Sequence, residues 1–217
     1  MNSLVCRRCD ASYPLDERIW RCGCGGMLDV SFEAAFHLGS LPKRPRTMWR
    51  YREAIPVADE SAVVSFQEGW TPLTDCEIGG IRVHLKHDYL FPSGSFKDRG
   101  ASVLVSRMKE LGVTSFHEDS SGNAGSALAA YAAAAGIGCT IYLPESTPDD
   151  KKTQILLYGA KVVTVSGPRR AAADAALEAG GESFYGSHVW NPFFFQGTKT
   201  VAYEICEQLY WSVPDTL

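Results

Sequence analysis

From Ser95 onward the chain alternates between helix-like and strand-like segments, and this alternation constrains the fold more than any other feature. Strands that alternate with helices predict an open, mostly parallel sheet with flanking helices, an α/β fold. Ser95 and Asp98 have the spacing of a capping box at the first helix. From apolar periodicity and glycine stops, the predicted helices span 95–111, 123–135, 149–158, 168–179 and 198–210, and the predicted strands span 113–118, 139–143 and 161–165.

The region before Ser95 divides in two. Residues 1–40 are rich in cysteine, glycine and arginine, and a basic linker with two prolines follows at 41–46. Such a change of composition marks a boundary. We therefore expect a small module at 1–40 and an α/β region at 41–217. Within that region, Ile81–Lys86 alternates apolar and polar residues with period two, which predicts a half-buried strand.

Four of the seven cysteines lie in the first 24 residues, as Cys6, Cys9, Cys22 and Cys24. Clustered cysteines in a chain without secretory features favour a metal over disulfides. Two thiolate pairs on tight turns can give the tetrahedral four-sulfur site that zinc prefers. The pattern resembles a zinc ribbon, although the second pair is Cys-x-Cys rather than Cys-x-x-Cys. A structural zinc is predicted, and a knuckle without metal is the alternative.

Charge and hydropathy narrow the classes of function. Residues 1–52 hold 9 Lys and Arg against 5 Asp and Glu, whereas residues 53–217 hold 12 against 20. The short basic segment favours an anionic partner. The larger part is acidic and lacks the basic patch that is typical of proteins that bind nucleic acids. No apolar run approaches the roughly 20 residues of a membrane span, and the N-terminus lacks a signal pattern. A cytoplasmic protein is expected.

Lys97 stands within the first helical turn of the segment Ser93–Gly100 (SGSFKDRG). Burial lowers the pKa of a lysine, and so does the positive end of a helix dipole. A lysine held neutral in this way can attack an aldehyde and form a Schiff base. The alternative reading is an ordinary helix start with an exposed lysine.

A second motif, Ser120–Gly125 (SSGNAG), follows a predicted strand and opens a predicted helix. Free backbone N–H groups at a helix start suit a carboxylate or a phosphate, and glycines let a ligand approach closely. Asn123 adds a side-chain amide that can bond a cofactor hydroxyl. The alternative reading is an ordinary N-cap. Together with Lys97, the motif points to an enzyme that uses pyridoxal 5'-phosphate (PLP).

The chain resembles the threonine synthase family, in the fold type II group of PLP enzymes related to tryptophan synthase β. The resemblance spans nearly all 217 residues and includes the N-terminal cysteine module. The lysine motif and the Ser-Ser-Gly-Asn motif are specific in combination. The matching segments, in chain order, are Glu68–Leu73 (EGWTPL), Pro92–Gly100 (PSGSFKDRG), Ser120–Gly125, Ala129–Ala133 with Gly136, Tyr158–Val163 (YGAKVV), Asn191-Pro192 and Gly197–Thr200 (GTKT).

The resemblance implies a role for each matched residue. Lys97 is expected to bind PLP as a Schiff base and to shuttle protons, and Asn123 is expected to bond the pyridoxal 3-hydroxyl. The turn formed by Ser120, Ser121, Gly122, Asn123 and Gly125 is expected to hold the substrate carboxylate, and Asn191 to face the substrate phosphate. The family reaction converts O-phosphohomoserine and water to threonine and phosphate, a step of threonine biosynthesis.

Two departures from the family pattern affect these expectations. Phe91 precedes Pro92 where the family often has Asn. The family also has further strands with a glycine-rich loop for the cofactor phosphate, which are not found before Leu217. A truncated product, a partial sequence and half of a split enzyme are the readings left open, the last with a second chain as partner. A homo-oligomer and no membrane partner are expected.

Other functions fit the same motifs. A cysteate synthase or a threonine or serine dehydratase would use the same lysine and asparagine. A different class of function is a non-catalytic scaffold, in which the zinc ribbon and its basic flank bind an anionic partner.

Overall fold

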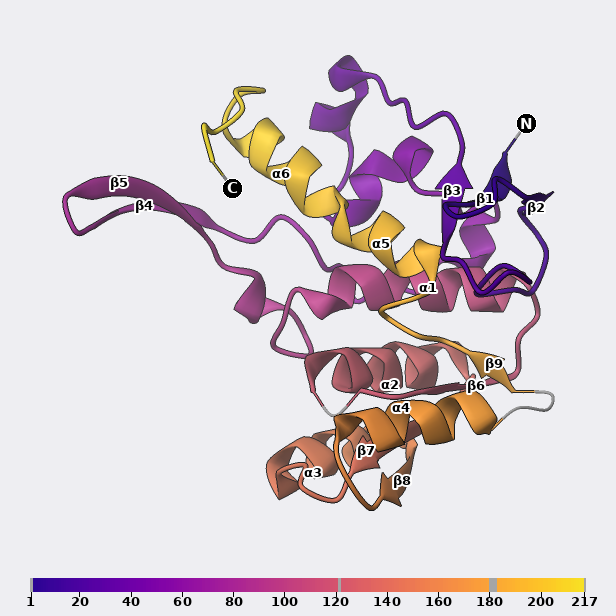
Figure 1. Cartoon of the computed structure of the whole chain (residues 1–217). Helices are drawn as coiled ribbons and strands as arrows, with labels where there is room; N and C mark the ends of the chain where they lie inside the picture. Colours follow the sequence, from indigo (N-terminus) through magenta and orange to yellow (C-terminus); the bar gives the residue numbers. More distant parts are fainter. Residues whose placement is uncertain (1, 121, 180–182, 217) are drawn as a thin grey trace.

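A four-stranded parallel sheet forms the centre of the C-terminal two thirds of the chain (Figure 1). The computed structural model describes residues 2–120, 122–179 and 183–216. The strand order is β8 (Lys161–Val165), β7 (Gly138–Pro144), β6 (Ser115–Glu118) and β9 (Phe184–Tyr185). The predicted α/β class with a parallel sheet is therefore confirmed.

In the part of the chain that the structure describes, six α-helices accompany this sheet. α2 and α4 both pack against β7, while α1 packs against α2 on one side and against α5 on another. The helices are α1 (Lys97–Glu110), α2 (Asn123–Ala135), α3 (Asp149–Leu157), α4 (Arg169–Glu178), α5 (Pro192–Thr198) and α6 (Thr200–Gln208). The predicted ranges of α2 and β8 are confirmed at both ends, and Gly136 ends α2 with a left-handed φ of 69°.

The predicted helix 198–210 is wrong in its extent. The chain turns into helix earlier, at Pro192, because the Asn191 side chain caps α5 by accepting a hydrogen bond of 3.1 Å from the backbone N–H of Phe193. Proline at the first helical position favours the same start. α5 then continues into α6 through Lys199, which has helical dihedral angles.

The start of α1 also differs from prediction. Ser95 Oγ accepts a 3.3 Å hydrogen bond from the backbone N–H of Lys97, as in a cap. The carboxylate of Asp98, however, accepts from the backbone N–H of Ser93 at 3.0 Å and from the Ser93 hydroxyl, so the reciprocal half of the capping box is not formed. The Asp98 carboxylate instead closes the turn that precedes the helix.

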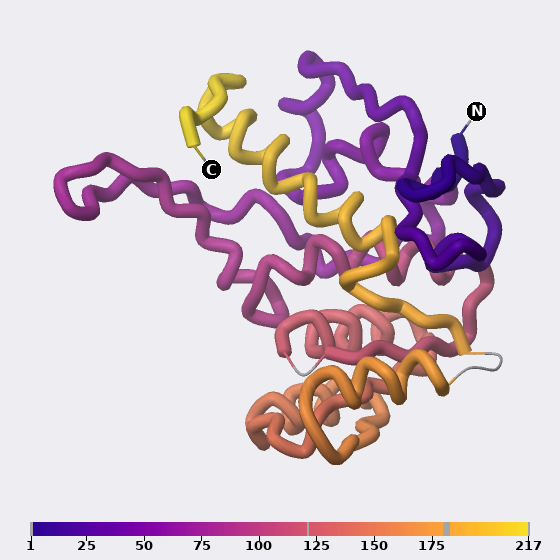
Figure 2. Tube along the Cα trace, viewed as in Figure 1, coloured from indigo at the N-terminus to yellow at the C-terminus, as the bar shows by residue number. Residues whose placement is uncertain are grey.

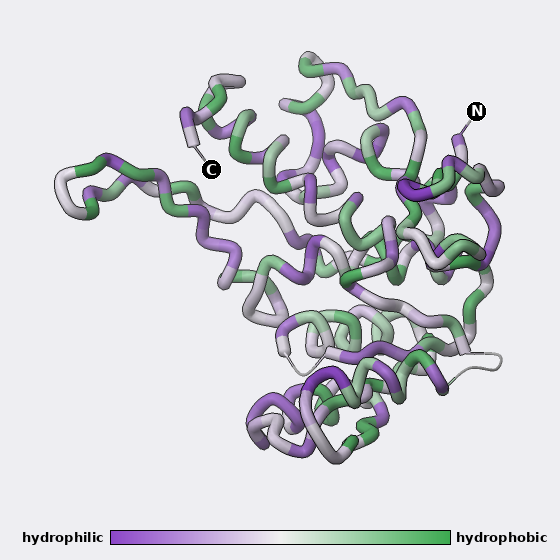
Figure 3. The backbone as a smooth tube through the Cα atoms, in the orientation of Figure 1, coloured by the Kyte–Doolittle hydropathy of each residue, from purple (hydrophilic) through white to green (hydrophobic). Residues whose placement is uncertain are grey.

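A two-stranded hairpin projects from the body of the molecule (Figures 1 and 2). β4 (Leu73–Ile78) and β5 (Ile81–Lys86) pair in antiparallel register around Gly79 and Gly80, whose φ angles are both positive, as a two-residue hairpin turn requires. The strand predicted at 81–86 is confirmed, but the expectation that it is half-buried is wrong. Figure 3 shows hydrophobic residues along this projecting arm.

The N-terminal segment forms its own antiparallel sheet in the order β2 (Ser12–Pro14), β1 (Ser3–Cys6) and β3 (Leu28–Ser31). Leu4 and Leu28 are buried and belong to the same hydrophobic core as Val103 and Leu104 of α1. Short 3-10 helices at Leu38–Lys43, Met48–Ala54 and Glu60–Ala62 lie between this sheet and the hairpin, and a fourth at Asp88–Leu90 lies between the hairpin and α1. Among the described residues, no helix is long and apolar enough to cross a membrane.

Candidate active site and metal centre

Lys97 is the first residue of α1 and is half-buried. Its ammonium nitrogen lies 4.6 Å from the centre of the Phe96 ring and 5.7 Å from the centre of the Phe194 ring. Within residues 2–120, 122–179 and 183–216, Nζ forms neither a hydrogen bond nor an ion pair. Desolvation lowers the pKa of Lys97 below its ordinary value, and the nearby Glu118 carboxylate partly opposes this shift. The site therefore favours a more nucleophilic amine than a surface lysine offers.

In the Ser120–Gly125 motif, which leads into the first turn of α2, only glycine fits at the sixth position. A Cβ on Gly125 would stand 2.4 Å from the carbonyl oxygen of Ser120. Ser120 is buried, Gly122 is half-buried, and the backbone N–H of Gly122 donates to Ser120 Oγ at 3.4 Å. Ser121, which was expected to help bind the substrate carboxylate, lies outside the described residues.

One face of α3 links the lysine turn to the start of α2. Lys151 donates a 3.2 Å hydrogen bond from Nζ to Asn123 Oδ1, and Gln154 donates a 3.1 Å hydrogen bond from Nε2 to the carbonyl of Ser93. Residues three apart lie on the same side of a helix. The exposed Asn123 amide and the turn before Lys97 are thus joined through a single helix.

Asn191, the expected contact of the substrate phosphate, is buried at the start of α5. Its side chain is 1% exposed, and its Oδ1 is used to cap α5. Its Nδ2 is one of the buried polar atoms that have no hydrogen-bond partner among the described residues. A free donor therefore remains, but the capping bond alone accounts for an asparagine here.

A buried ion-pair network anchors the helix that carries Lys97. Arg99 is wholly buried, and its guanidinium donates to Asp88 at 2.8 and 3.0 Å and to Glu204 of α6 at 3.0 Å on both oxygens. Glu204 also receives Lys86 from the base of the hairpin. Arg99 thus connects α1 to α6, whose Glu204 lies 105 residues further along the chain.

A histidine–carboxylate pair was missed from the sequence. Glu118 ends β6 and is wholly buried, and it pairs with His188 in the loop before α5. Glu118 was detectable in principle, because functional groups gather where parallel strands end. His188 had no such signal, because no spacing rule connects it to Glu118, 70 residues away.

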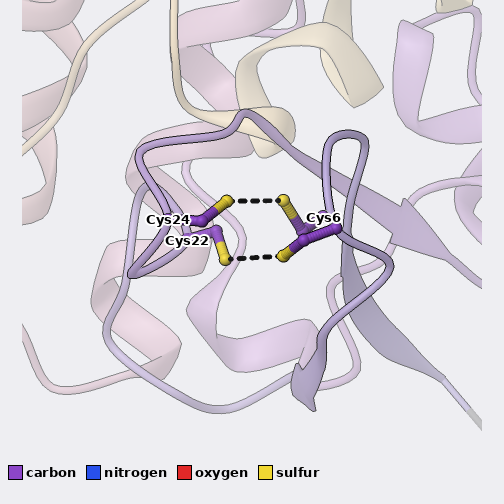
Figure 4. Close-up of side chains that lie close together, drawn as sticks. Cys6, Cys22 and Cys24 are labelled. Atoms are coloured by element: carbon purple, nitrogen blue, oxygen red, sulfur yellow. Dashed lines mark hydrogen bonds between the residues drawn. The ribbon is translucent and has the colours of Figure 1, made fainter.

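The four N-terminal cysteines converge, and their sulfur atoms all lie within 4.8 Å of one another. Figure 4 shows the close-up, in which Cys6 faces Cys24. The Sγ atoms of Cys6 and Cys24 are 3.6 Å apart, and those of Cys9 and Cys22 are 3.5 Å apart. Tetrahedral zinc with bonds of about 2.3 Å places sulfur pairs about 3.8 Å apart, so the cluster has the dimensions of a four-cysteine zinc site.

Gly26 makes room for these sulfur atoms. A Cβ at this position would stand 2.6 Å from Cys6 Sγ and 3.2 Å from Cys24 Sγ. The turn that carries the second cysteine pair is also closed by a 3.0 Å hydrogen bond from the Cys22 N–H to the Gly26 carbonyl. The local sequence therefore brings all four sulfurs together without a side chain between them.

Comparison with known proteins agrees with this arrangement. The family model described as pyridoxal-phosphate dependent enzyme matches residues 64–217. Threonine synthase of Methanocaldococcus jannaschii is 41% identical over 97% of this chain and 55% of its own length. Threonine synthase of Methanosarcina acetivorans is 36% identical over 100% of this chain and 56% of its own length. The chain thus spans about half the length of these curated relatives.

Solved structures share the fold over about two thirds of this chain. O-ureido-L-serine synthase matches with a TM-score of 0.60 and 25% identity, over 68% of this chain and 50% of that one. Serine racemase from Dictyostelium discoideum matches with a TM-score of 0.56 and 27% identity, over 64% of this chain and 47% of that one. With a half-buried lysine at the start of α1, a glycine turn before α2 and a family match over most of its length, this chain belongs to the pyridoxal-phosphate dependent enzymes and is a homologue of threonine synthase.

Proposed function

We propose that this chain carries the lysine-bearing part of a lyase that converts O-phosphohomoserine and water to threonine and phosphate. The observation that carries the proposal is Lys97, whose amine is half-buried, free of ion pairs in the described chain, and lowered in pKa by desolvation. The identity to two threonine synthases supports the choice of substrate.

The residues present fit the reactive end of PLP. Lys97 supplies the amine that binds an aldehyde, and the exposed Asn123 amide supplies a bond for the 3-hydroxyl. PLP, when bound, supplies the electron sink that makes the substrate carbons acidic. No part of the described chain is assigned to the cofactor phosphate.

The protein's own contribution is orientation and proton transfer. Gly125 has no room for a side chain, whereas Gly122 leaves open space beside it, so the N–H groups at this helix start are suited to the substrate carboxylate. The amine of Lys97 is suited to take a proton from one substrate carbon and return it to another, because its lowered pKa brings it nearer to neutral pH. Asn191 would add its unpartnered Nδ2 as a donor for the substrate phosphate.

We also propose that residues 1–40 form a separate module held by one zinc ion on Cys6, Cys9, Cys22 and Cys24. The support is the approach of all four sulfurs to within 4.8 Å. A closed four-cysteine site has no open position for a substrate, so the role of the metal is structural. Its removal is expected to loosen the sheet β2-β1-β3, including Leu4 and Leu28, which belong to the core shared with α1.

The exposed apolar residues of the hairpin β4–β5 are evidence for a further polypeptide segment that packs against it. Ile78 is 60% exposed and Ile81 is 67% exposed, and they pair directly across the two strands. An isolated two-stranded ribbon is marginally stable in water, so an apolar face of this kind is suited to pack against another segment. We propose that a complementary C-terminal segment, in this polypeptide or in a second one, covers it and completes the site.

Phosphate release tests the proposed reaction. The chain is incubated with PLP and either O-phosphohomoserine or O-phosphoserine, with and without the separately produced C-terminal portion of the Methanocaldococcus jannaschii relative. We expect phosphate to be released from O-phosphohomoserine and not from O-phosphoserine. The release should be lost in Lys97→Arg and retained in Lys199→Arg. Turnover of O-phosphoserine in its place would assign the chain to a different substrate.

A further inference from the structure

Glu118 and His188 come from distant parts of the chain and form a close pair. Glu118 Oε1 contacts His188 Nδ1, and Glu118 Oε2 accepts a 3.1 Å hydrogen bond from the backbone N–H of His188. The side chain of Glu118 is completely buried and that of His188 is 15% exposed. Both carboxylate oxygens therefore bind the same histidine, one at its ring and one at its backbone, which is more than a surface ion pair requires.

This pair lies beside the candidate reactive lysine. The His188 ring packs edge-on against Phe194 at 5.9 Å, and the ammonium of Lys97 lies 5.7 Å from the centre of the same ring. The carboxylate of Glu118 also acts electrostatically on Lys97. Phe194 is held close to α1, because a Cβ on Gly100 would collide with its ring. Lys97 and His188 are thus fixed around one aromatic side chain.

The hydrogen bonds leave one nitrogen of His188 available. Nδ1 faces Glu118, and Nε2 contacts no hydrogen-bond partner in the part of the chain that the structure describes. A carboxylate on Nδ1 fixes the imidazole tautomer and orients the opposite nitrogen for proton exchange. We propose that His188, positioned by Glu118, is a second acid–base group of the Lys97 site, with Nε2 as the atom that exchanges the proton.

The inference rests on the proposed elimination and deepens it. Protonated His188 gives its Nε2 proton to the departing phosphate oxygen as the carbon–oxygen bond breaks. Neutral His188 then takes a proton from the water whose hydroxyl adds to the substrate, so the imidazole returns to its starting state. Among the described residues, the charged and titratable groups that act on the pair are Lys97 from α1, Asp119 beyond β6, Cys139 from β7 and Tyr185 from β9.

The tautomer of His188 tests the pair in the chain without cofactor. In protein labelled with nitrogen-15 in its imidazoles, we expect the Nδ1–H form for neutral His188. In Glu118→Gln, an NH2 group replaces one of the two oxygens that accept from the backbone N–H and the ring Nδ1–H of His188. The Nδ1–H tautomer is then no longer the single form, and we expect a mixture or the other tautomer. His84, whose Nδ1 contacts the exposed Asp75, is the matched control and keeps its tautomer in that variant. An Nε2–H form in the unsubstituted protein would overturn the proposal.

Chemical modification tests whether Nε2 faces the site. Protein reduced with borohydride in the presence of PLP is treated with diethyl pyrocarbonate, and one peptide digest reports Lys97, His188 and His84. With the Lys97 adduct present, loss of His188 modification is expected while that of His84 is unchanged. If the Lys97 adduct forms and diethyl pyrocarbonate still modifies His188, this inference is overturned but the proposed function is not. If no Lys97 adduct forms, the proposed function is overturned as well.

The kinetics of a His188 variant distinguish a role in proton transfer from a structural role. In the elimination assay, His188→Gln is expected to lower kcat by about 10²–10⁴-fold, the usual contribution of general acid–base catalysis, with little change in KM. A KM effect with unchanged kcat would contradict a role in proton transfer.

Discussion

Replacing Arg99 by leucine removes the only cation that contacts both Asp88 and Glu204 among the described residues, two positions after Lys97 on α1. Arg99 and Glu204 have completely buried side chains, and that of Asp88 is 11% exposed. Breaking a buried pair by removing one partner leaves uncompensated charge and costs about 3–5 kcal/mol. We therefore expect Arg99→Leu to lower the free energy of unfolding by that amount.

The chain offers a matched control for this substitution. Arg82 pairs with Asp75 at 2.6 Å on the hairpin, where the two side chains are 76% and 52% exposed. Exposed ion pairs contribute about 0–1 kcal/mol, so Arg82→Leu should change stability little. Urea unfolding followed by tryptophan fluorescence and by circular dichroism measures both variants.

The pH dependence gives a second check on the same network. Burial alone would raise the pKa of Glu204, but hydrogen bonds and charge from Arg99 outweigh it and hold the pKa below its ordinary value; the same holds for Asp88. Such groups stabilise the fold above the ordinary carboxyl pKa of about 4, and this stability is lost as the pH falls through their depressed values. The difference between wild type and Arg99→Leu should therefore be largest near pH 7 and narrow below about pH 4. Equal costs for Arg99→Leu and Arg82→Leu, or a difference independent of pH, would refute the reasoning.

Three further predictions concern single positions. Gly26→Ala should reduce bound zinc from one per chain, measured by metal analysis under reducing conditions, because its Cβ would collide with Cys6 Sγ. Gly125→Ala should weaken PLP uptake, measured by absorbance, because its Cβ would meet the Ser120 carbonyl at 2.4 Å; a full occupancy would contradict this. Burial raises the pKa of Asp98 to about 6, so the fold favours its protonated form. The free energy of unfolding should fall as the pH rises from about 4 to 6, and Asp98→Asn should remove that slope.

Local sequence signals located the regular elements well. The range 123–135 was right at both ends because alanine favours helix throughout and Gly136 can adopt the left-handed angle that ends it. α5 was missed because its start depends on the Asn191 cap, which was interpreted as a ligand contact. The hairpin strand was recognised by its period of two, but periodicity reports which residues share a face and not whether anything covers that face.

The site was predictable only in part for a related reason. Lys97 and the turn at Ser120–Gly125 stand in contiguous motifs, so their chemistry could be interpreted from neighbouring residues. The pair of Glu118 and His188 depends on how β6 and the loop before α5 meet, which no local signal encodes. The same is true of Arg99, whose partner Glu204 lies on another helix.

Trapping the cofactor with borohydride tests the central claim most directly. The purified chain is mixed with PLP, reduced, digested and mapped, with Lys97→Arg and Lys199→Arg as paired variants. Lys199 is the stringent control, because burial lowers its pKa to about 8 and makes it a competing amine. One reduced adduct is expected, on Lys97, and it is expected to be lost only in Lys97→Arg. An adduct on Lys199, or scattered over surface lysines, would contradict this claim.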